Sequence, residues 1–345
     1  MLLSKWCRSL LLAGAGSLVL AAGASAVGAP PPPKAVNGHP VATVATGVVT
    51  PTSFAFDTTT GTTFVGAFGN ERNGKGGGVL GIVPGGRPAL IAGIPSGIAG
   101  LVFHDGTLYV SAVTQKGGSI LAYSGWNGTV FASSKTIFNA RKTVGSVNGL
   151  AWGPNGRLYA GGGLVEDVNK KGIAKKSPFP HPYSVFSIKP DGTGFKVVAR
   201  GLRQPWQMTF VGSSSNPYVS VLSQDAGQIP RDAIVVAKPG ANFGFPKCFI
   251  GVGVGCAHAK FSKPLITLPK HASPMGIQAV GSTLYVALFG GIGKSGPEVV
   301  TIPAKAGGKP KPFLTGFVAP VVAVGINGTT LYAGDLTGTI YAVAL

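Results

Sequence analysis

Short apolar runs separated by polar turns recur along most of the chain. Six times, an apolar run is followed by a turn rich in Gly, Asn or Asp and by a second run with an aromatic residue near its centre. These copies span residues 53–67, 100–112, 149–162, 207–221, 276–288 and 321–335. Their aromatic residues are Phe64, Tyr109, Tyr159, Tyr218, Tyr285 and Tyr332, at intervals of 45 to 67 residues. Runs of this length predict strands, and turns such as Asp105-Gly106 favour tight hairpins.

Further apolar runs follow the hairpins. A third run comes after each of them, as GSILAYS (118–124) does, and a fourth leads into the next copy in four cases, as KVVAR (196–200) does. The 55 Gly and 27 Pro residues interrupt the chain too often for long helices. Four strands at this period are typical of a propeller blade. The pattern therefore predicts an all-β fold, a six-bladed β-propeller.

The two ends of the repeat region complement each other. The chain ends on a third run, GTIYAVAL (338–345), and a spare run, VATVATGVVTP (41–51), precedes the first hairpin. We expect this N-terminal strand to pair into the last blade and close the ring, so that the loose edges at the two ends of the repeat region are both paired. A pair of β-sandwiches is the alternative architecture. It does not account for a strand missing at one end and a spare strand at the other.

Residues 1–26 have the features of an export signal peptide. Lys5 and Arg8 precede an apolar run, and Ala24-Ser25-Ala26 forms a cleavage site of small residues. A transmembrane anchor is the competing interpretation, but the run is short and diluted by Gly, Ala and Ser. We expect a Pro-rich linker over 27–40, a propeller domain over 41–345, and a secreted, periplasmic or cell-surface protein without a stable membrane span.

The charge of the chain indicates which classes of partner the protein favours. The chain has 29 Lys and Arg against 10 Asp and Glu, and loss of the signal lowers the net charge from +19 to +17. Such a surface favours anionic partners or an acidic cofactor. Export, and the lack of a recognisable helical nucleic-acid-binding motif, argue against nucleic acid as the partner.

Cys248 and Cys256 are the two cysteines that remain after removal of the signal. In an exported protein such a pair predicts a disulfide, and the spacing of the two residues does not suit a metal site.

Loops at one end of a propeller surround its central channel. These are the segments before each innermost strand and the loops after each second strand. Arg203 and Gln204, in GLRQP (201–205), belong to the first type, and Arg231 and Lys294 lie in loops of the second type. Functional residues concentrate in such loops, so we expect a site at this end.

Three stretches between about residues 145 and 295 resemble the exported glucose/sorbosone dehydrogenase family. These are SVNGLAWGPNGRLYAGGG (146–163), GLRQPWQMTF (201–210), and DAIVVAKPGANFGFPKC (232–248) followed by Cys256 and KHASPMGIQ (270–278). Members of this family are six-bladed propellers that hold pyrroloquinoline quinone (PQQ) above the channel. The resemblance therefore implies a quinoprotein that oxidises a small-molecule sugar.

The resemblance also implies roles for individual residues. Arg203 matches the cofactor-contacting Arg of the family, and its guanidinium could hold a quinone oxygen or a carboxylate. Gln204 stands where the family has Asn, and His271 is carried over as a loop residue near the cofactor. Arg231 and Lys294 could add positive charge around the cofactor. Calcium, as in some family members, would be held near Glu166 and Asp167. A strut between two blades is an equally weighted interpretation of Arg203.

The family's catalytic histidines have no counterparts. Gly145 stands near the position of the first histidine, and Phe289 replaces the second. Two hypotheses follow: a PQQ-dependent dehydrogenase of a sugar hydroxyl or aldehyde, or a non-catalytic exported propeller that binds an anionic glycan or a protein partner. A lactonase would need a carboxylate-rich metal centre, which ten acids across the whole chain hardly supply.

Overall fold

The structure, a computed structural model, describes residues 30–345 except 71–74, 84–85, 95–96, 115–116, 164–176, 224–230, 249–254, 259 and 294–295. The predicted signal peptide, residues 1–26, lies outside this part of the chain. Strands dominate, and the helices among the described residues are two short 3-10 turns, Ala140–Lys142 and Cys256–His258. Within the same residues, no helix has the length and apolarity needed to cross a membrane.

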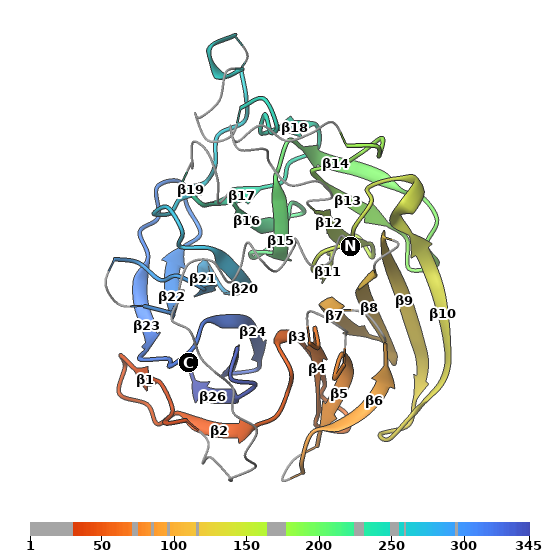
Figure 1. Ribbon diagram of the computed structural model, residues 1–345, viewed down its shortest axis with the longest axis vertical. Coiled ribbons are helices and arrows are strands. Elements are labelled where there is room, and N and C mark those ends of the chain that lie inside the picture. Colours follow the sequence, from red (N-terminus) through yellow and green to blue (C-terminus); the bar gives the residue numbers. More distant parts are fainter. Residues whose placement is uncertain are drawn as a thin grey trace.

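Six antiparallel sheets stand side by side as blades around a common centre (Figure 1). Blade 1 holds β3 (Pro51–Asp57), β4 (Thr62–Ala67), β5 (Gly78–Ile82) and β6 (Ala89–Gly93). Blade 2 holds β7 (Gly97–His104), β8 (Thr107–Thr114), β9 (Gly117–Trp126) and β10 (Phe131–Asn139). Blade 3 holds β11 (Leu150–Trp152), β12 (Leu158–Gly162), β13 (Ser184–Ile188) and β14 (Lys196–Arg200), with β18 (Ala241–Asn242) added parallel to β14.

The C-terminal half supplies the other three blades. Blade 4 holds β15 (Gln204–Thr209), β16 (Tyr218–Leu222), β17 (Ala233–Val236) and β19 (Ile266–Thr267). Blade 5 holds β20 (Pro274–Val280), β21 (Thr283–Leu288), β22 (Glu298–Pro303) and β23 (Lys311–Thr315). Blade 6 holds β24 (Val321–Asn327), β25 (Thr330–Asp335) and β26 (Ile340–Ala344). The prediction of an all-β, six-bladed propeller is confirmed.

Both N-terminal strands pair with C-terminal blades. β2 (Ala42–Ala45) runs antiparallel to β26, with Ala42 opposite Ala342, so the N-terminal strand completes the last blade as the sequence predicted. β1 (Lys34–Ala35) lies within the segment expected to be a linker and pairs with β23, with Lys34 opposite Thr315. The chain therefore joins the propeller a few residues before position 40.

The core lies between the blades, where apolar side chains from neighbouring sheets interlock. Phe64 and Leu108, from blades 1 and 2, are fully buried in one such layer. Near the centre of the ring, the innermost strands of neighbouring blades lie so close together that one of the two strands has no room for a side chain at the point of contact. A Cβ added to Gly100 would lie 2.3 Å from the Leu150 nitrogen, and one added to Gly276 would lie 2.5 Å from the Val324 nitrogen. Glycine at these positions therefore lets six inner strands meet around a narrow axis.

Candidate functional site

The loops before each innermost strand and after each second strand meet at one end of the ring, which we call the channel face. Blade 4 shows this directly. Arg203 immediately precedes β15 and Ser223 immediately follows β16, and the Nη1 group of Arg203 donates a hydrogen bond to the Ser223 carbonyl. The expectation that both types of loop share one end therefore holds in this blade.

Arg203 is buried, with only 2% of its surface exposed. The network that holds it continues beyond Ser223. The Ser223 amide donates to the Oδ1 atom of Asp232 at 2.7 Å, and the Ser273 amide donates to the Oδ2 atom of the same residue at 2.8 Å. Because Ser273 belongs to the segment that leads into blade 5, the network ties blade 4 to blade 5. This geometry supports a strut role for Arg203.

A second polar group faces GLRQP from blade 3. Asn148 is fully buried, and its Nδ2 group donates to the Pro205 carbonyl at 2.7 Å. Among the described residues, its Oδ1 atom and the Oγ atom of nearby Ser146 have no hydrogen-bond partner. Buried polar atoms are nearly always paired, so two unpaired ones within three residues of one segment indicate a place for a water molecule or a ligand.

The backbone at Gly145 favours glycine over residues with a side chain. Its φ angle of 85° lies in the left-handed region, and its carbonyl accepts a hydrogen bond from the Gly118 amide at 2.9 Å. An L-residue at this φ would be strained. The local backbone therefore favours glycine at position 145, near which the family that the sequence resembles carries a histidine.

Gln207 crosses the centre of the ring below the channel face. Its Nε2 group donates to the Ala99 carbonyl in blade 2 and to the Thr52 carbonyl in blade 1, the latter at 3.4 Å. Its Oε1 atom lies against Gly149 of blade 3, where an added Cβ would approach it to 2.4 Å. One blade-4 side chain thus contacts three other blades.

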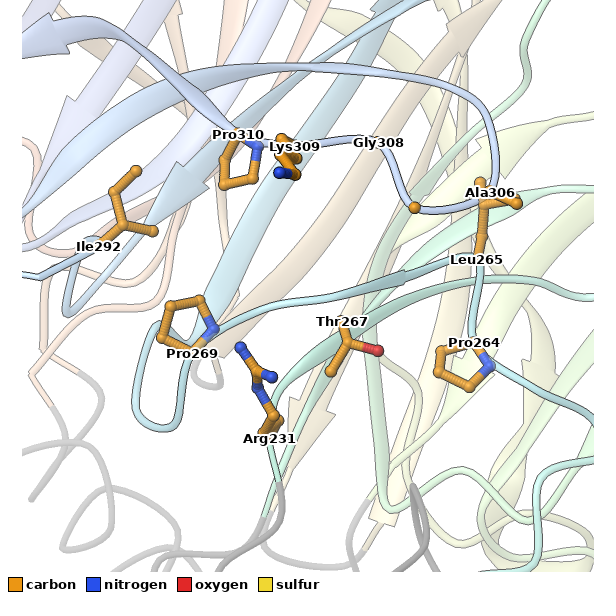
Figure 2. Close-up of a pocket in the computed structure, with 11 residues that line it drawn as sticks. Arg231, Pro264, Leu265, Thr267, Pro269, Ile292, Ala306, Gly308, Lys309 and Pro310 are labelled. Atoms are coloured by element: carbon orange, nitrogen blue, oxygen red, sulfur yellow. The ribbon is translucent and has the colours of Figure 1, made fainter.

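The remaining residues predicted for the site are dispersed. Gln204 is buried and begins β15, opposite Leu222. His271 is exposed, in a turn with a φ angle of 61°. Arg231 lines a groove on the outer wall between blades 4 and 5 (Figure 2). Lys294, Glu166 and Asp167 lie outside the described residues. The structure therefore brings Arg203 and Gln204 together and places Arg231 elsewhere.

Sequence reasoning did not single out Ser146, Asn148 or Gln207. The only available signal was their position, in the segments that precede β11 or form β15. Their polar character alone did not distinguish them from other loop residues, because the partners of Asn148 and Gln207 are backbone carbonyls of other blades and Ser146 has no partner among the described residues.

The buried acids near the channel face hold loops in place. Asp232 accepts the two amides described above, Glu298 accepts the Ile292 amide at 2.7 Å, and Asp335 accepts the Thr337 amide at 3.0 Å. Burial raises the pKa of Asp335 and, with the nearby Asp335 carboxyl, raises the pKa of Tyr341 to about 12. In the described part of the chain, no three His, Cys, Asp or Glu residues gather in a way that could hold a metal ion.

The predicted disulfide is present. Cys248 and Cys256 are bonded, with their Cα atoms 4.9 Å apart, a separation usual for disulfides. The bridge closes the loop that follows β18 of blade 3.

No protein-family model and no curated protein matches the sequence. The fold is similar to that of a PQQ-bound aldose sugar dehydrogenase from Streptomyces coelicolor, with 21% identity, a TM-score of 0.69, and coverage of 90% of this chain and 99% of that one. It is also similar to a calcium structure of an AA12-family carbohydrate-active enzyme from Trichoderma reesei, with 16% identity, a TM-score of 0.71, and coverage of 91% and 97%. A gluconolactonase from Xanthomonas campestris is similar too, with 14% identity, a TM-score of 0.60, and coverage of 91% and 95%. At such identities the likeness establishes the fold alone.

Proposed function

We propose that the protein is an exported, sugar dehydrogenase-like quinoprotein that oxidises a sugar hydroxyl or aldehyde with PQQ bound over the channel face. The observation that carries the proposal lies at the junction of blades 3 and 4. There Asn148 donates a hydrogen bond to the Pro205 carbonyl of GLRQP, and the short segment that holds Asn148 has two unpaired buried polar atoms, on Asn148 and Ser146. The fold likeness to a PQQ-bound sugar dehydrogenase over 90% of the chain supports it.

The residues at this junction fit a ligand rich in oxygen atoms. PQQ carries carboxylates and two adjacent quinone oxygens, and when bound it would accept two electrons from the substrate. The Ser146 hydroxyl would donate to such oxygens and Arg203 would supply positive charge beneath them. We propose Glu166 and Asp167 as the ligands of a calcium ion.

The same residues do not supply a base. The chain has five histidines, and the one in a segment leading into an innermost strand, His271, is an exposed turn residue between blades 4 and 5. We therefore assign binding roles at the junction and no proton transfer. The export part of the proposal rests on the features of residues 1–26 and on the Cys248–Cys256 disulfide, which suits an oxidising compartment.

A second candidate function is a non-catalytic propeller that binds an anionic glycan or a protein partner. The burial of Arg203 and its hydrogen bond to the Ser223 carbonyl favour this candidate. A guanidinium that serves as a strut is not available as a cofactor ligand.

Titration of the protein lacking residues 1–26 with PQQ, with and without Ca²⁺, tests the proposal. We expect stoichiometric binding followed by cofactor absorbance, and a higher melting temperature, because a ligand at a hundred times its Kd adds about 2.7 kcal/mol to folding stability. Arg203→Gln should weaken PQQ binding at least tenfold.

Arg157→Gln is the matched control, because Arg157 is also hydrogen-bonded but lies in the hairpin turn at the opposite end of blade 3. Circular dichroism of both variants establishes that they are folded at the titration temperature. Absence of PQQ binding by the unmodified protein, or equal loss in both variants, would contradict the dehydrogenase proposal and favour the second candidate.

A further inference from the structure

A groove of about 630 Å³ runs along the outer wall between blades 4 and 5. One side is formed by β19 and its flanking residues, and the other by the loop between β22 and β23 (Figure 2). The volume lies within the range of about 300–1,000 Å³ that is usual for ligand sites. β19, which borders the groove, is the outermost strand of blade 4 and lies at the rim of the ring (Figure 1), so the groove is separate from the junction of blades 3 and 4.

The charged residues that line the groove are all positive. Its lining contains two cationic residues, Arg231 and Lys309, and no acid. The Nε group of Arg231 donates to the Leu268 carbonyl at 3.1 Å, which fixes the side chain and leaves its two terminal nitrogens without a partner among the described residues. Figure 2 shows the Arg231 guanidinium directed into the gap between Pro269 and Thr267, with Lys309 on the opposite wall. Two such cations suit a ligand with more than one carboxylate.

The walls are held in place by backbone hydrogen bonds. The Gly307 amide donates to the Leu265 carbonyl at 3.0 Å, which joins the blade-5 loop to blade 4. The Leu268 amide donates to the Asp232 carbonyl at 2.8 Å, which fixes the segment that receives Arg231. A ligand would therefore enter a largely preformed groove, which limits the entropy lost on binding.

The backbone of the groove disfavours an extended peptide as the occupant. β19 is the outermost strand of blade 4 and could in principle accept another strand. It is only two residues long, however, and Pro264 and Pro269 flank it closely, while Pro310 lies on the facing wall. Proline has no N–H group to donate to a ladder, so recognition falls to the side chains.

We propose that this groove binds the carboxylate groups of an acidic polysaccharide, with Arg231 and Lys309 as the contacts and the Thr267 hydroxyl as a further hydrogen-bonding group. The apolar faces of the prolines would lie against the C–H faces of the sugar rings. The net charge of +19 adds long-range attraction for such a polymer. The proposal is independent of the channel-face function and holds whether or not the protein binds PQQ.

The test measures binding of a fluorescent oligogalacturonate by anisotropy at low and high salt. We expect saturable binding by the unmodified protein that weakens as salt screens the exposed charges. The double variant Arg231→Gln/Lys309→Gln should bind at least tenfold more weakly. The matched control Lys135→Gln/Lys189→Gln removes two exposed charges from blades 2 and 3 and should change the Kd less than twofold.

Two competitors define the ligand class. Neutral dextran of the same length should not displace the probe, and poly-glutamate of the same charge should displace it at least tenfold less well. Absence of probe binding, equal losses in the two double variants, or equal competition by poly-glutamate would each overturn the proposal. A PQQ titration of the groove variant should match that of the unmodified protein, which keeps the two proposals separately testable.

Discussion

Two aspartates in similar turns show how local surroundings set the cost of a buried charge. Asp57 accepts hydrogen bonds from Thr59 and Thr60, and Asp335 accepts them from Thr337 and Thr339. Burial raises the pKa of both carboxyls, but the hydrogen bonds outweigh burial at Asp57 and its pKa is lowered, whereas the pKa of Asp335 stays raised. The two residues should therefore affect stability with opposite signs as pH changes.

The pH dependence of two Asn variants checks this. Ionised Asp335 opposes folding above its unfolded-state pKa, near 3.8, so Asp335→Asn should gain stability relative to the unmodified protein as pH rises from 4 to 7. Asp57 stabilises the fold once it is ionised, and this is lost as pH falls through its lowered pKa. Asp57→Asn should therefore lose stability relative to the unmodified protein as pH rises from the lowered pKa of Asp57 to its unfolded-state pKa, near 3.8. Urea unfolding at several pH values measures both differences, and a shared sign would contradict the argument.

Replacement of Gln207, which contacts three other blades, should lower the free energy of unfolding. Gln207→Leu keeps the size of the side chain but leaves the Ala99 and Thr52 carbonyls without their donor in a buried position. Unpaired buried polar groups cost about 1–3 kcal/mol, so we expect a loss of about 2 kcal/mol in the free energy of unfolding. Urea denaturation measures this loss.

Gln278→Leu is the matched control for Gln207→Leu. Gln278 also lies on an innermost strand, β20, but it is only half-buried, and within the described residues its side chain makes no hydrogen bond. We expect its unfolding free energy to change by less than about 0.5 kcal/mol. A similar loss in both variants would show that the bridge across the centre contributes nothing specific.

At the scale of strands, the sequence was most informative where turn chemistry and apolar pattern agreed. The Asp105-Gly106 turn has positive φ at both residues, as a tight hairpin requires, and it joins β7 to β8 as predicted. β10 was not distinguished, because its sequence FASSKTIFN places polar residues along an exposed outer edge and shows no alternation. β1 and β18 are two-residue strands that exist only because another strand lies beside them.

The same limit applies to the candidate site. Arg203 was found through a local motif, but its partner, the Ser223 carbonyl, could not be inferred from side-chain types. Asn148 and Gln207 donate hydrogen bonds to carbonyls 57 to 155 residues away in the chain. Because every residue has a backbone carbonyl, the sequence does not show which one accepts. Arg231 precedes β17 as expected, yet the sequence does not show that its side chain turns to the outer wall.

At the scale of the whole molecule, closure of the ring by the N-terminal strand is needed to complete blade 6. Blade 6 has three strands from the C-terminal end of the chain and one, β2, from the N-terminal end. Without β2, the outer edge of β26 would be open, and such an edge is prone to pairing with other molecules. Val48, just after β2, is also fully buried and its amide donates to the Gly338 carbonyl at 3.1 Å.

Two truncated proteins that start on either side of β2 separate its contribution from that of the preceding segment. A chain that starts at Val41 loses β1 but keeps β2, and it should melt within a few degrees of the longer protein, because β1 contributes only two paired residues. A chain that starts at Val49 loses β2 and Val48. It should melt lower by about 5 °C or more and should aggregate through the exposed edge of β26, a loss that corresponds to roughly 2–3 kcal/mol for a domain of this size. Differential scanning calorimetry and light scattering measure the two effects. Equal melting temperatures for the two truncated proteins would show that the ring is held by the contacts between blades alone, without the N-terminal strand.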